Sequence, residues 1–269
     1  MQARSALFNL YGDHLRAAGG RAPVAALIQV LAPLEITAPA VRTAISRMVR
    51  EGWLTPVRLP SGPGYALTQR AVQRLDEAAA RIYRTRVAPW DGHWHVLVLE
   101  RLPGRTGRER LRAGLTFLGY APLGGAGPST TWIAPRAAVE IDELLSRSGA
   151  AAHRFRAAVA DDADEDAGDL VRRTWDLDAL ARAYDAWLAR AREMVAAAGD
   201  ALDDEQAFAL RSRLVHEWRK FLFSDPGLPR ELLPTDWAGD RAAKFFDAVA
   251  GRLHLPATRF VEACLGGVR

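Results

Sequence analysis

A short amphipathic helix followed at once by a β-hairpin is the feature that most restricts the fold of this chain. Thr37 is a good N-cap, and residues 38–50 place apolar side chains at the spacing of one buried helical stripe. The stripe consists of Val41, Ala44, Ile45, Met48 and Val49. Gly52 ends the helix, and two short strands follow at 53–59 and 64–68, around the turn sequence PSGPG. The sequence therefore predicts a helix with one buried face that leads directly into a hairpin.

Two more helices are predicted before this pair of elements. Residues 5–19 carry leucines and a tyrosine at helical spacing and stop at two glycines, and residues 23–34 begin at a proline. The order helix, helix, turn, helix, hairpin is typical of a winged helix-turn-helix, whose third helix lies in the major groove of DNA. We therefore expect a DNA-binding module of this kind at the N-terminus.

The candidate DNA-binding residues lie on the polar side of the third helix. At about 100° per residue, this side is opposite the apolar stripe and carries residue types that bond base edges or phosphates. The candidates are Thr43, Ser46, Arg47 and Arg50 on this face, Arg42 at its edge and Arg58 at the root of the hairpin. A charged helix face is often only solvated, but the adjacent hairpin favours the DNA-binding interpretation. We interpret Trp53 and Tyr65 as core residues of the hairpin.

Positive charge is concentrated in the same region. Residues 1–89 contain 12 arginines and five acidic residues, a net charge of +7, and the remainder contains 24 basic and 27 acidic residues, a net charge of −3. Arginine outnumbers lysine by 34 to two, which suggests a GC-rich genome, so part of the arginine excess reflects codon usage. A basic N-terminal part on a mildly acidic body favours a polyanionic partner.

The composition predicts a cytoplasmic protein. No apolar run approaches the ~18 residues that a membrane-spanning helix needs, and the N-terminus has no apolar segment with a small-residue cleavage site. The single cysteine, Cys264, cannot form an internal disulfide and fits a reducing compartment. We therefore expect no membrane partner.

The middle of the chain alternates between strands and helices. A helix at 69–84 is followed by a Pro/Gly break at 87–92. The elements predicted next are a strand at 93–100, a helix at 105–120, strands at 120–123 and 130–134, a helix at 135–147 and a strand at 152–160. This βαββαβ order is that of a ferredoxin-like domain. The acidic run at 161–169 lacks the spacing of an EF-hand loop, so we interpret it as a solvated linker.

The C-terminal part is predicted to be mostly helical and rich in aromatic residues. Helices are expected at 176–195, 203–223, 239–253 and 256–265, with a Pro-rich connection at 224–237 that is too apolar to be a free linker. Cations and aromatic rings that could bind an aryl group on an anionic carrier are His216, Trp218, Arg219, Lys220, Arg230 and Trp237. On a helix, His216, Arg219 and Lys220 would share a face. The alternative is a helix packed by its aromatic residues, with an ordinary basic surface.

Four segments together resemble the PaaX family, repressors of phenylacetic acid catabolism. Three are N-terminal, SALFNLYGDHLR, APAVRTAISRMVREGWL and RLPSGPGYALT, and the fourth, HEWRKFLFSDPGLPRELLPTDW, resembles the C-terminal signature of the family. The resemblance covers nearly the whole chain. It implies a repressor that leaves its operator on binding an acyl-CoA, phenylacetyl-CoA in the family, and a middle domain similar to the small CRISPR-associated adaptation subunit.

No enzymatic site is predicted. The chain has no G-x-S-x-G, P-loop or Rossmann fingerprint and no convincing pair of nucleophile and base. Some proteins related to the middle domain are nucleases with an aspartate at the end of the first strand, but here that strand ends in Glu100 without a second acid. His93 and His95 could share a metal from one strand face, yet no third ligand is near. We therefore expect neither a cofactor nor a metal.

Together these features predict an α+β protein of three domains. They are a winged helix-turn-helix at 1–89, a ferredoxin-like domain at 90–165, and a helical effector and dimerisation domain at 166–269. The expected partners are double-stranded operator DNA with an inverted repeat, an acyl-CoA effector and a second copy of the chain. Two alternatives stay open: the same type of regulator answering a different acyl-CoA, and a metal-dependent nuclease built on the middle domain.

Overall fold

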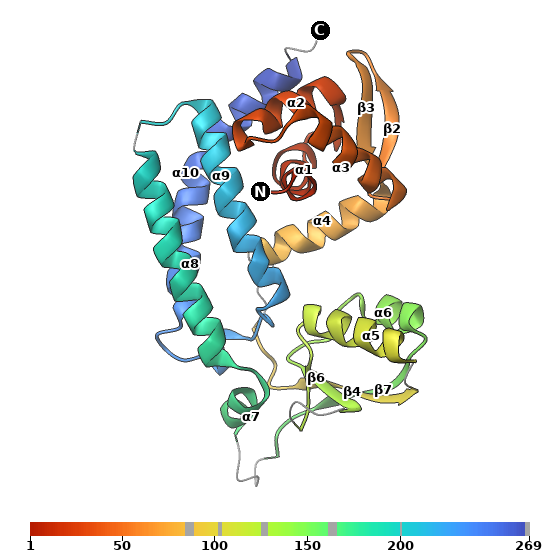
Figure 1. Cartoon of the computed structure of the whole chain (residues 1–269). Helices are drawn as coiled ribbons and strands as arrows, with labels where there is room; N and C mark the ends of the chain where they lie inside the picture. The colour runs from red at the N-terminus through yellow and green to blue at the C-terminus, as the bar shows by residue number, and fades with distance from the viewer. Residues whose placement is uncertain (84–88, 102–103, 125–128, 161–165, 200, 267–269) are drawn as a thin grey trace. The chain divides into compact units, whose positions relative to one another are not determined.

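The computed structural model describes residues 1–83, 89–101, 104–124, 129–160, 166–199 and 201–266 (Figure 1). The chain divides into two compact units. The first comprises Met1–Arg86, Asp185–Arg219 and Arg241–Arg269, and the second comprises Val87–Tyr184 and Lys220–Asp240. Residues 161–165 of the acidic run, which include the predicted boundary after residue 165, lie outside the described residues. The division into domains at 1–89, 90–165 and 166–269 stays a prediction.

Residues 1–83, which we call the head, combine helices with a small antiparallel sheet. The elements are α1 (Ala3–Leu10), a π-helical turn η1 (Tyr11–Leu15), β1 (Arg21–Pro23), α2 (Val24–Leu31), a 3-10 turn η2 (Ala32–Leu34), α3 (Ala38–Arg50), β2 (Leu54–Leu59), β3 (Gly62–Leu67) and α4 (Gln69–Ile82). The helices and the hairpin follow the predicted order. Strand β1 is absent from the prediction; it pairs with β3, which gives the sheet order β1-β3-β2. Three residues ending in a proline carry no alternation that would reveal a strand.

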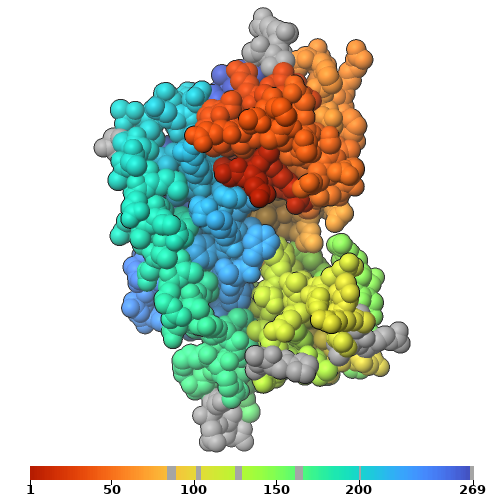
Figure 2. All heavy atoms as spheres, viewed as in Figure 1, coloured from red at the N-terminus to blue at the C-terminus, as the bar shows by residue number. Residues whose placement is uncertain are grey.

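The head shares one hydrophobic core with two long helices of the first unit. The apolar stripes of α1, α2 and α3 meet in this core, where Leu7, Leu27 and Ile45 are almost fully buried. Phe208 of α9 (Asp204–Trp218) and Val261 of α10 (Ala238–Gly266) belong to the same cluster. In the space-filling view, atoms of the head directly adjoin those of α9 (Figure 2). The head is therefore packed against α9 and α10 and does not form a core of its own.

Helix α10 corrects one prediction. The sequence predicts two helices, 239–253 and 256–265, separated near Pro256, but a single helix runs through this proline. Ala257, Val261 and Cys264 follow it at helical spacing and are all buried in the shared core. This burial compensates for the backbone hydrogen bond that a proline removes from a helix interior.

The middle part of the chain has the predicted βαββαβ order. Its elements are β4 (Trp94–Arg101), α5 (Arg105–Phe117), β5 (Ala121–Pro122), β6 (Thr131–Ala134), α6 (Ile141–Ser148) and β7 (Ala151–Ala157). All strand pairs are antiparallel, in the order β5-β6-β4-β7. Helices α5 and α6 cover one face of the sheet (Figure 1), and Leu97, Leu115 and Trp132 form part of the core between them. Helix α6 begins at Ile141, later than the predicted residue 135.

The Pro-rich connection packs within the second unit, as its apolar composition predicts. The 3-10 turn η3 (Arg219–Phe223) leads into this connection, which contains the 3-10 turn η4 (Arg230–Leu232). The ring of Phe223 lies 5.5 Å from that of Phe117 in α5. Gly119 has a φ of 87°, and a Cβ there would lie 2.5 Å from the carbonyl oxygen of Pro226, so only glycine permits this approach.

Helix α7 (Ala167–Thr174) corrects the interpretation of residues 161–169 as a linker throughout. Asp166 and Asp169 form a capping box at its start, so the last acidic residues of the run begin a helix. Helix α7 contacts η4. Acidic residues near a helix N-terminus also interact favourably with the helix dipole.

In the described ranges, no single helix is long and apolar enough to cross a bilayer. The segments Val24–Leu34 and Ala38–Arg50 pass a length and composition test together, but they are bent by 120°. Both contribute side chains to the core of the head.

Candidate nucleic-acid interface and effector segment

Helix α3 follows α2 after a sharp turn. The segments Val24–Leu34 and Ala38–Arg50 are bent by 120°, and Glu35 between them has a φ of 60°, in the left-handed region. A helix-turn-helix joins its two helices at about 90–120°. The side chains of α3 that face the core are Val41, Ala44, Ile45 and Met48. The turn and this stripe together direct the opposite side of α3 to solvent.

All six candidate DNA-binding residues are exposed. Five of them come from α3, where they lie away from the buried stripe: Arg42, Thr43, Ser46, Arg47 and Arg50. Ser46 donates a hydrogen bond to the carbonyl oxygen of Arg42 at 3.0 Å. Arg58 lies in β2 opposite Pro63 of β3, next to the last pair before the turn, so it stands near the tip of the hairpin and not at its root, where the sequence predicted it. The structure thus gathers five candidates on one helix face and places the sixth on the hairpin.

The candidate arginines of α3 and of the hairpin are available to contact an anion. Across the described ranges, the guanidinium groups of Arg47, Arg50 and Arg58 take part in no hydrogen bond or ion pair. The acidic residue that follows α3, Glu51, is paired with Arg4. Lysine and arginine side chains that neutralise phosphates supply most of the sequence-independent affinity for DNA. The exposed face of α3 is therefore suited to a polyanion.

The aromatic residues of the hairpin pack against the head, as the sequence predicts. The ring of Trp53 meets that of Phe8 edge-on, with centroids 4.8 Å apart. The hydroxyl of Tyr11 donates to the carbonyl oxygen of Tyr65 at 3.0 Å. Both contacts fix the base of the hairpin next to α1 and η1.

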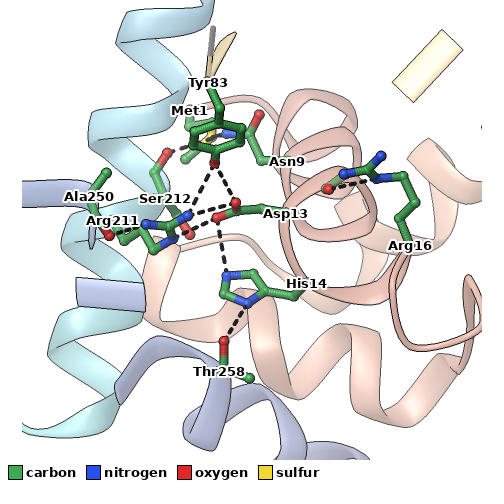
Figure 3. Close-up of polar contacts among 11 residues, drawn as sticks. Met1, Asn9, Asp13, His14, Arg16, Tyr83, Arg211, Ser212, Ala250 and Thr258 are labelled. Atoms are coloured by element: carbon green, nitrogen blue, oxygen red, sulfur yellow. Dashed lines mark hydrogen bonds and ion pairs between the residues drawn. The ribbon is translucent and has the colours of Figure 1, made fainter. Parts of the chain in front are cut away.

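A buried polar cluster, which we call the Asp13 cluster, joins the head to α9 and α10 (Figure 3). Its members are Asp13, His14, Tyr83 and Arg211. The guanidinium of Arg211 in α9 donates to both carboxylate oxygens of Asp13, from Nε at 2.7 Å and from Nη2 at 2.8 Å. It also donates to the carbonyl oxygen of Ala250 in α10 and, at 3.1 Å, to the hydroxyl of Tyr83. One buried arginine thus binds η1, the end of α4 and α10.

Burial and charge together set the protonation states in the Asp13 cluster. Burial opposes the charged form of Asp13, but the hydrogen bond and charge of Arg211 outweigh it, so the pKa of Asp13 is lowered. Burial lowers the pKa of His14 to about 4, although its Nε2 lies 3.4 Å from a carboxylate oxygen of Asp13. At neutral pH the cluster therefore holds an ionised pair, Asp13 and Arg211, beside a neutral imidazole.

The sequence interpretation missed the Asp13 cluster, although one signal was available. Arg211 lies in α9 four residues after Ala207 and three before Leu214, both of which are buried. An arginine on an apolar stripe is rarely buried unless it is paired. Its partner lies 198 residues away, so the sequence indicates a need for a partner without identifying it.

The six candidate effector residues divide between the two units. His216, Trp218 and Arg219 belong to the first unit, and Lys220, Arg230 and Trp237 belong to the second. The α-helix α9 ends at Trp218, and Arg219 and Lys220 lie in the 3-10 turn η3. The α-helical spacing that predicted a shared face for His216, Arg219 and Lys220 therefore stops before the two cations.

Several of these residues already have structural contacts. Trp218 stacks on Phe246 with centroids 4.8 Å apart, and its indole nitrogen donates to the carbonyl oxygen of Ile82 at 3.2 Å. The guanidinium of Arg230 donates to the carbonyl oxygens of Leu233, Pro234 and Thr235 and pairs with Asp240 at 2.9 Å. Trp237 is buried near Tyr184. Trp218 thus packs in a core, and Arg230 fixes its own loop.

The residues considered for a metal or nuclease site are dispersed. In the part of the chain that the structure describes, no group of three or more His, Cys, Asp or Glu residues could hold a metal ion. Glu100 is 65% exposed, and its carboxylate lies 3.7 Å from Nε2 of His153. The Nδ1 of His95 is hydrogen-bonded to the hydroxyl of Tyr120 at 2.6 Å. These contacts gather no second acid beside Glu100.

Three segments of PaaX-like proteins match successive parts of the chain. The PaaX-like protein family matches residues 2–71, the PaaX protein central Cas2-like domain matches residues 87–169, and the PaaX-like protein C-terminal domain matches residues 175–263. The transcriptional repressor PaaX of Escherichia coli (strain K12) is 30% identical over 264 residues, which cover 96% of this chain and 82% of that protein. The solved structure of an uncharacterised protein from Mycobacterium tuberculosis is also similar. The two proteins share 26% sequence identity and superpose with a TM-score of 0.64, and the match covers 98% of each chain.

Proposed function

Because this chain belongs to the PaaX-like family, we propose that it is a transcriptional repressor that binds operator DNA through a winged helix-turn-helix formed by its head. The relative from Escherichia coli is a transcriptional repressor, which confirms the prediction of a regulator and not an enzyme. A repressor acts where the chromosome lies, so the proposal places the protein in the cytoplasm.

The observation that carries the DNA-binding proposal is the exposed face of α3. This face presents Arg47 and Arg50 without ion pairs in the described ranges, directly before a hairpin. In a winged helix-turn-helix, the helix at this position enters the major groove, where an arginine binds a guanine through two hydrogen bonds. We assign base contacts to Arg47 and Arg50, supported by Arg42, Thr43 and Ser46, and a phosphate contact beside the groove to Arg58.

A gel-shift assay on the DNA upstream of the protein's own gene tests these assignments. Arg47→Ala and Arg50→Ala should each weaken binding by about 1–3 kcal/mol if the lost contact is bidentate to guanine. Arg58→Ala should weaken binding to all sequences about equally and reduce the salt slope by about 1. Arg252→Ala is a matched control, because Arg252 is an exposed arginine of α10 and forms no ion pair in the described ranges.

Wild-type binding by both Arg47→Ala and Arg50→Ala would refute the placement of α3 in the groove. A change of preference at a single base pair in Arg58→Ala would move Arg58 from phosphate to base recognition. In the same reactions, Mg²⁺ or Mn²⁺ should leave DNA and RNA intact. Metal-dependent cleavage that disappears in Glu100→Ala would instead support the nuclease alternative.

We further propose that the repressor binds an inverted repeat as a homodimer and leaves it on binding an aryl-CoA, phenylacetyl-CoA. The family resemblance supports this effector, and the alternative is a different acyl-CoA. The effector would favour a dimer geometry that misplaces the two copies of α3. Titration of phenylacetyl-CoA, other CoA thioesters and free phenylacetate against a preformed protein–DNA complex tests the proposal. Release by phenylacetate alone at a similar concentration would contradict the need for CoA.

The segment from His216 to Trp237 is the sequence-based candidate for the effector site. Under this proposal, Arg219→Ala or Arg230→Ala leaves operator binding intact and raises the thioester concentration needed for release, while His216, Trp218, Lys220 and Trp237 complete the site. Wild-type release curves from both arginine variants would place the site elsewhere. Within the described part of the first unit, His216 is the member of this set that lines the apolar cavity discussed below.

A further inference from the structure

An apolar cavity of about 280 Å³ lies between α8 (Leu177–Ala198) and α9 within the first unit. Trp187, Ala191 and Met194 line it from one stripe of α8, and Leu214 lines it from α9. An apolar cavity of about 150 Å³ is enough to hold benzene. The cavity between α8 and α9 therefore has room for one aromatic ring with a short arm, or for a short acyl chain.

Two arginines stand beside this apolar wall. Arg190 of α8 and Arg213 of α9 line the cavity, and both are exposed. Neither guanidinium takes part in a hydrogen bond or ion pair within the described ranges. Glu217 and His216 also line the cavity, so two arginines face one carboxylate. Unpaired guanidinium groups beside an apolar slot fit a ligand that is apolar at one end and anionic at the other.

One wall of the cavity belongs to the head. Met1 lines the cavity, and its sulfur accepts a hydrogen bond from the side-chain amide of Asn9 in α1 at 3.7 Å. The same amide donates to the carbonyl oxygen of Ser212 in α9 at 3.3 Å. Ser212 lies between Arg211, which binds Asp13, and Arg213, which lines the cavity. A ligand in this cavity would therefore touch the head and α9 where they are hydrogen-bonded to each other.

We propose that this cavity binds the apolar group of a small amphipathic anion, an aromatic or aliphatic acid or its phosphate-bearing thioester, with the anionic group held by Arg190 and Arg213. The inference rests on the proposed function, because it locates the apolar end of the effector. Bound ligand displaces Met1 and shifts α9 against the head. The contacts of Asn9 and Asp13 with α9 transmit that shift to the elements that carry α3.

Calorimetric titration of the full chain without DNA tests the cavity directly. The probes are phenylacetyl-CoA, phenylacetate and CoA. Ala191→Phe fills the cavity and should weaken binding of the aryl probe at least about tenfold. The probe can then no longer place its ring in the apolar slot while its anionic group contacts the arginines. Because Ala191 is buried, a melting curve must show that this variant folds.

A second variant avoids the core. Arg190→Ala combined with Arg213→Ala changes only exposed side chains and should also weaken binding about tenfold or more. Arg252→Ala, which removes an exposed arginine away from the cavity lining, should bind like the wild type. Binding of phenylacetyl-CoA but not phenylacetate would assign the anion to the phosphates of the carrier, and equal binding would assign it to the carboxyl end; both support the cavity.

Three results would overturn the inference. They are no binding of any probe by the wild type, binding of CoA as tight as that of its thioester, and unchanged affinity in both cavity variants. Gel shifts without ligand test the proposed function separately, because they measure operator binding alone. If the wild-type protein binds no operator, the DNA-binding proposal is refuted. If the wild type binds and releases the operator and both cavity variants release it at the same thioester concentration, the cavity proposal alone is refuted.

Discussion

Replacing Asp13 with asparagine removes the negative charge that the buried guanidinium of Arg211 binds. The side chains of Arg211 and Asp13 are 4% and 9% exposed, so water cannot solvate the charge that remains. Breaking a buried ion pair by removing one partner costs about 3–5 kcal/mol. Whole domains are stable by only about 5–15 kcal/mol. Asp13→Asn should therefore remove a large fraction of the stability of the first unit.

Thermal unfolding followed by tryptophan fluorescence measures this loss. A domain of about 150–250 residues loses about 2–4 °C in melting temperature per kcal/mol, so Asp13→Asn should melt about 6–20 °C lower. The matched control is Asp204→Asn, which breaks the exposed pair between Asp204 of α9 and Arg259 of α10. Water and salt screen the charges of an exposed pair, so it contributes little to stability and the control should remain close to the wild type.

The double variant Asp13→Asn with Arg211→Met tests the reason for the loss. If the cost comes from an uncompensated buried charge, removal of the guanidinium should restore part of the stability. A loss in Asp13→Asn no larger than that in Asp204→Asn would refute the reasoning. The hydrophobic core would then account for the attachment of the head to α9 without the Asp13 cluster.

Two further predictions concern the head. Burial lowers the pKa of His14 to about 4, whereas an unfolded histidine titrates near 6.5. The free energy of unfolding should therefore be fully retained above about pH 6.5 and fall by about 3 kcal/mol as the pH drops to about 4; His14→Gln should lose this part of the pH dependence in urea titrations. A Cβ on Gly64 would lie 2.6 Å from the carbonyl oxygen of Ala22, so Gly64→Ala should destabilise the head by about 1–3 kcal/mol. Gly251→Ala, in open space on α10, should raise the melting temperature; equal melting curves for the two variants would contradict the close approach of β1 and β3.

The candidate DNA interface is the part of the molecule that the sequence predicts best. The apolar stripe from Val41 to Met48 specifies which side of α3 is buried, and the structure buries that side and exposes Arg47 and Arg50. The βαββαβ order of the middle domain is predicted for the same reason, since the period of apolar residues distinguishes helices from strands. Both patterns are local, because each is set by residues within a few turns or one strand.

Only the tertiary structure decided what covers each buried face. Strand β1 exists because Ala22 pairs with Tyr65 of β3, and α10 continues through Pro256 because the residues after it enter the core of the head. Asp13 and Arg211 meet across 198 residues, and the cavity beside Arg213 combines α8, α9 and Met1. A periodic sequence states that a face is apolar or that an arginine on it needs a partner. It does not state which distant segment supplies the contact, because that depends on the packing of all the helices together.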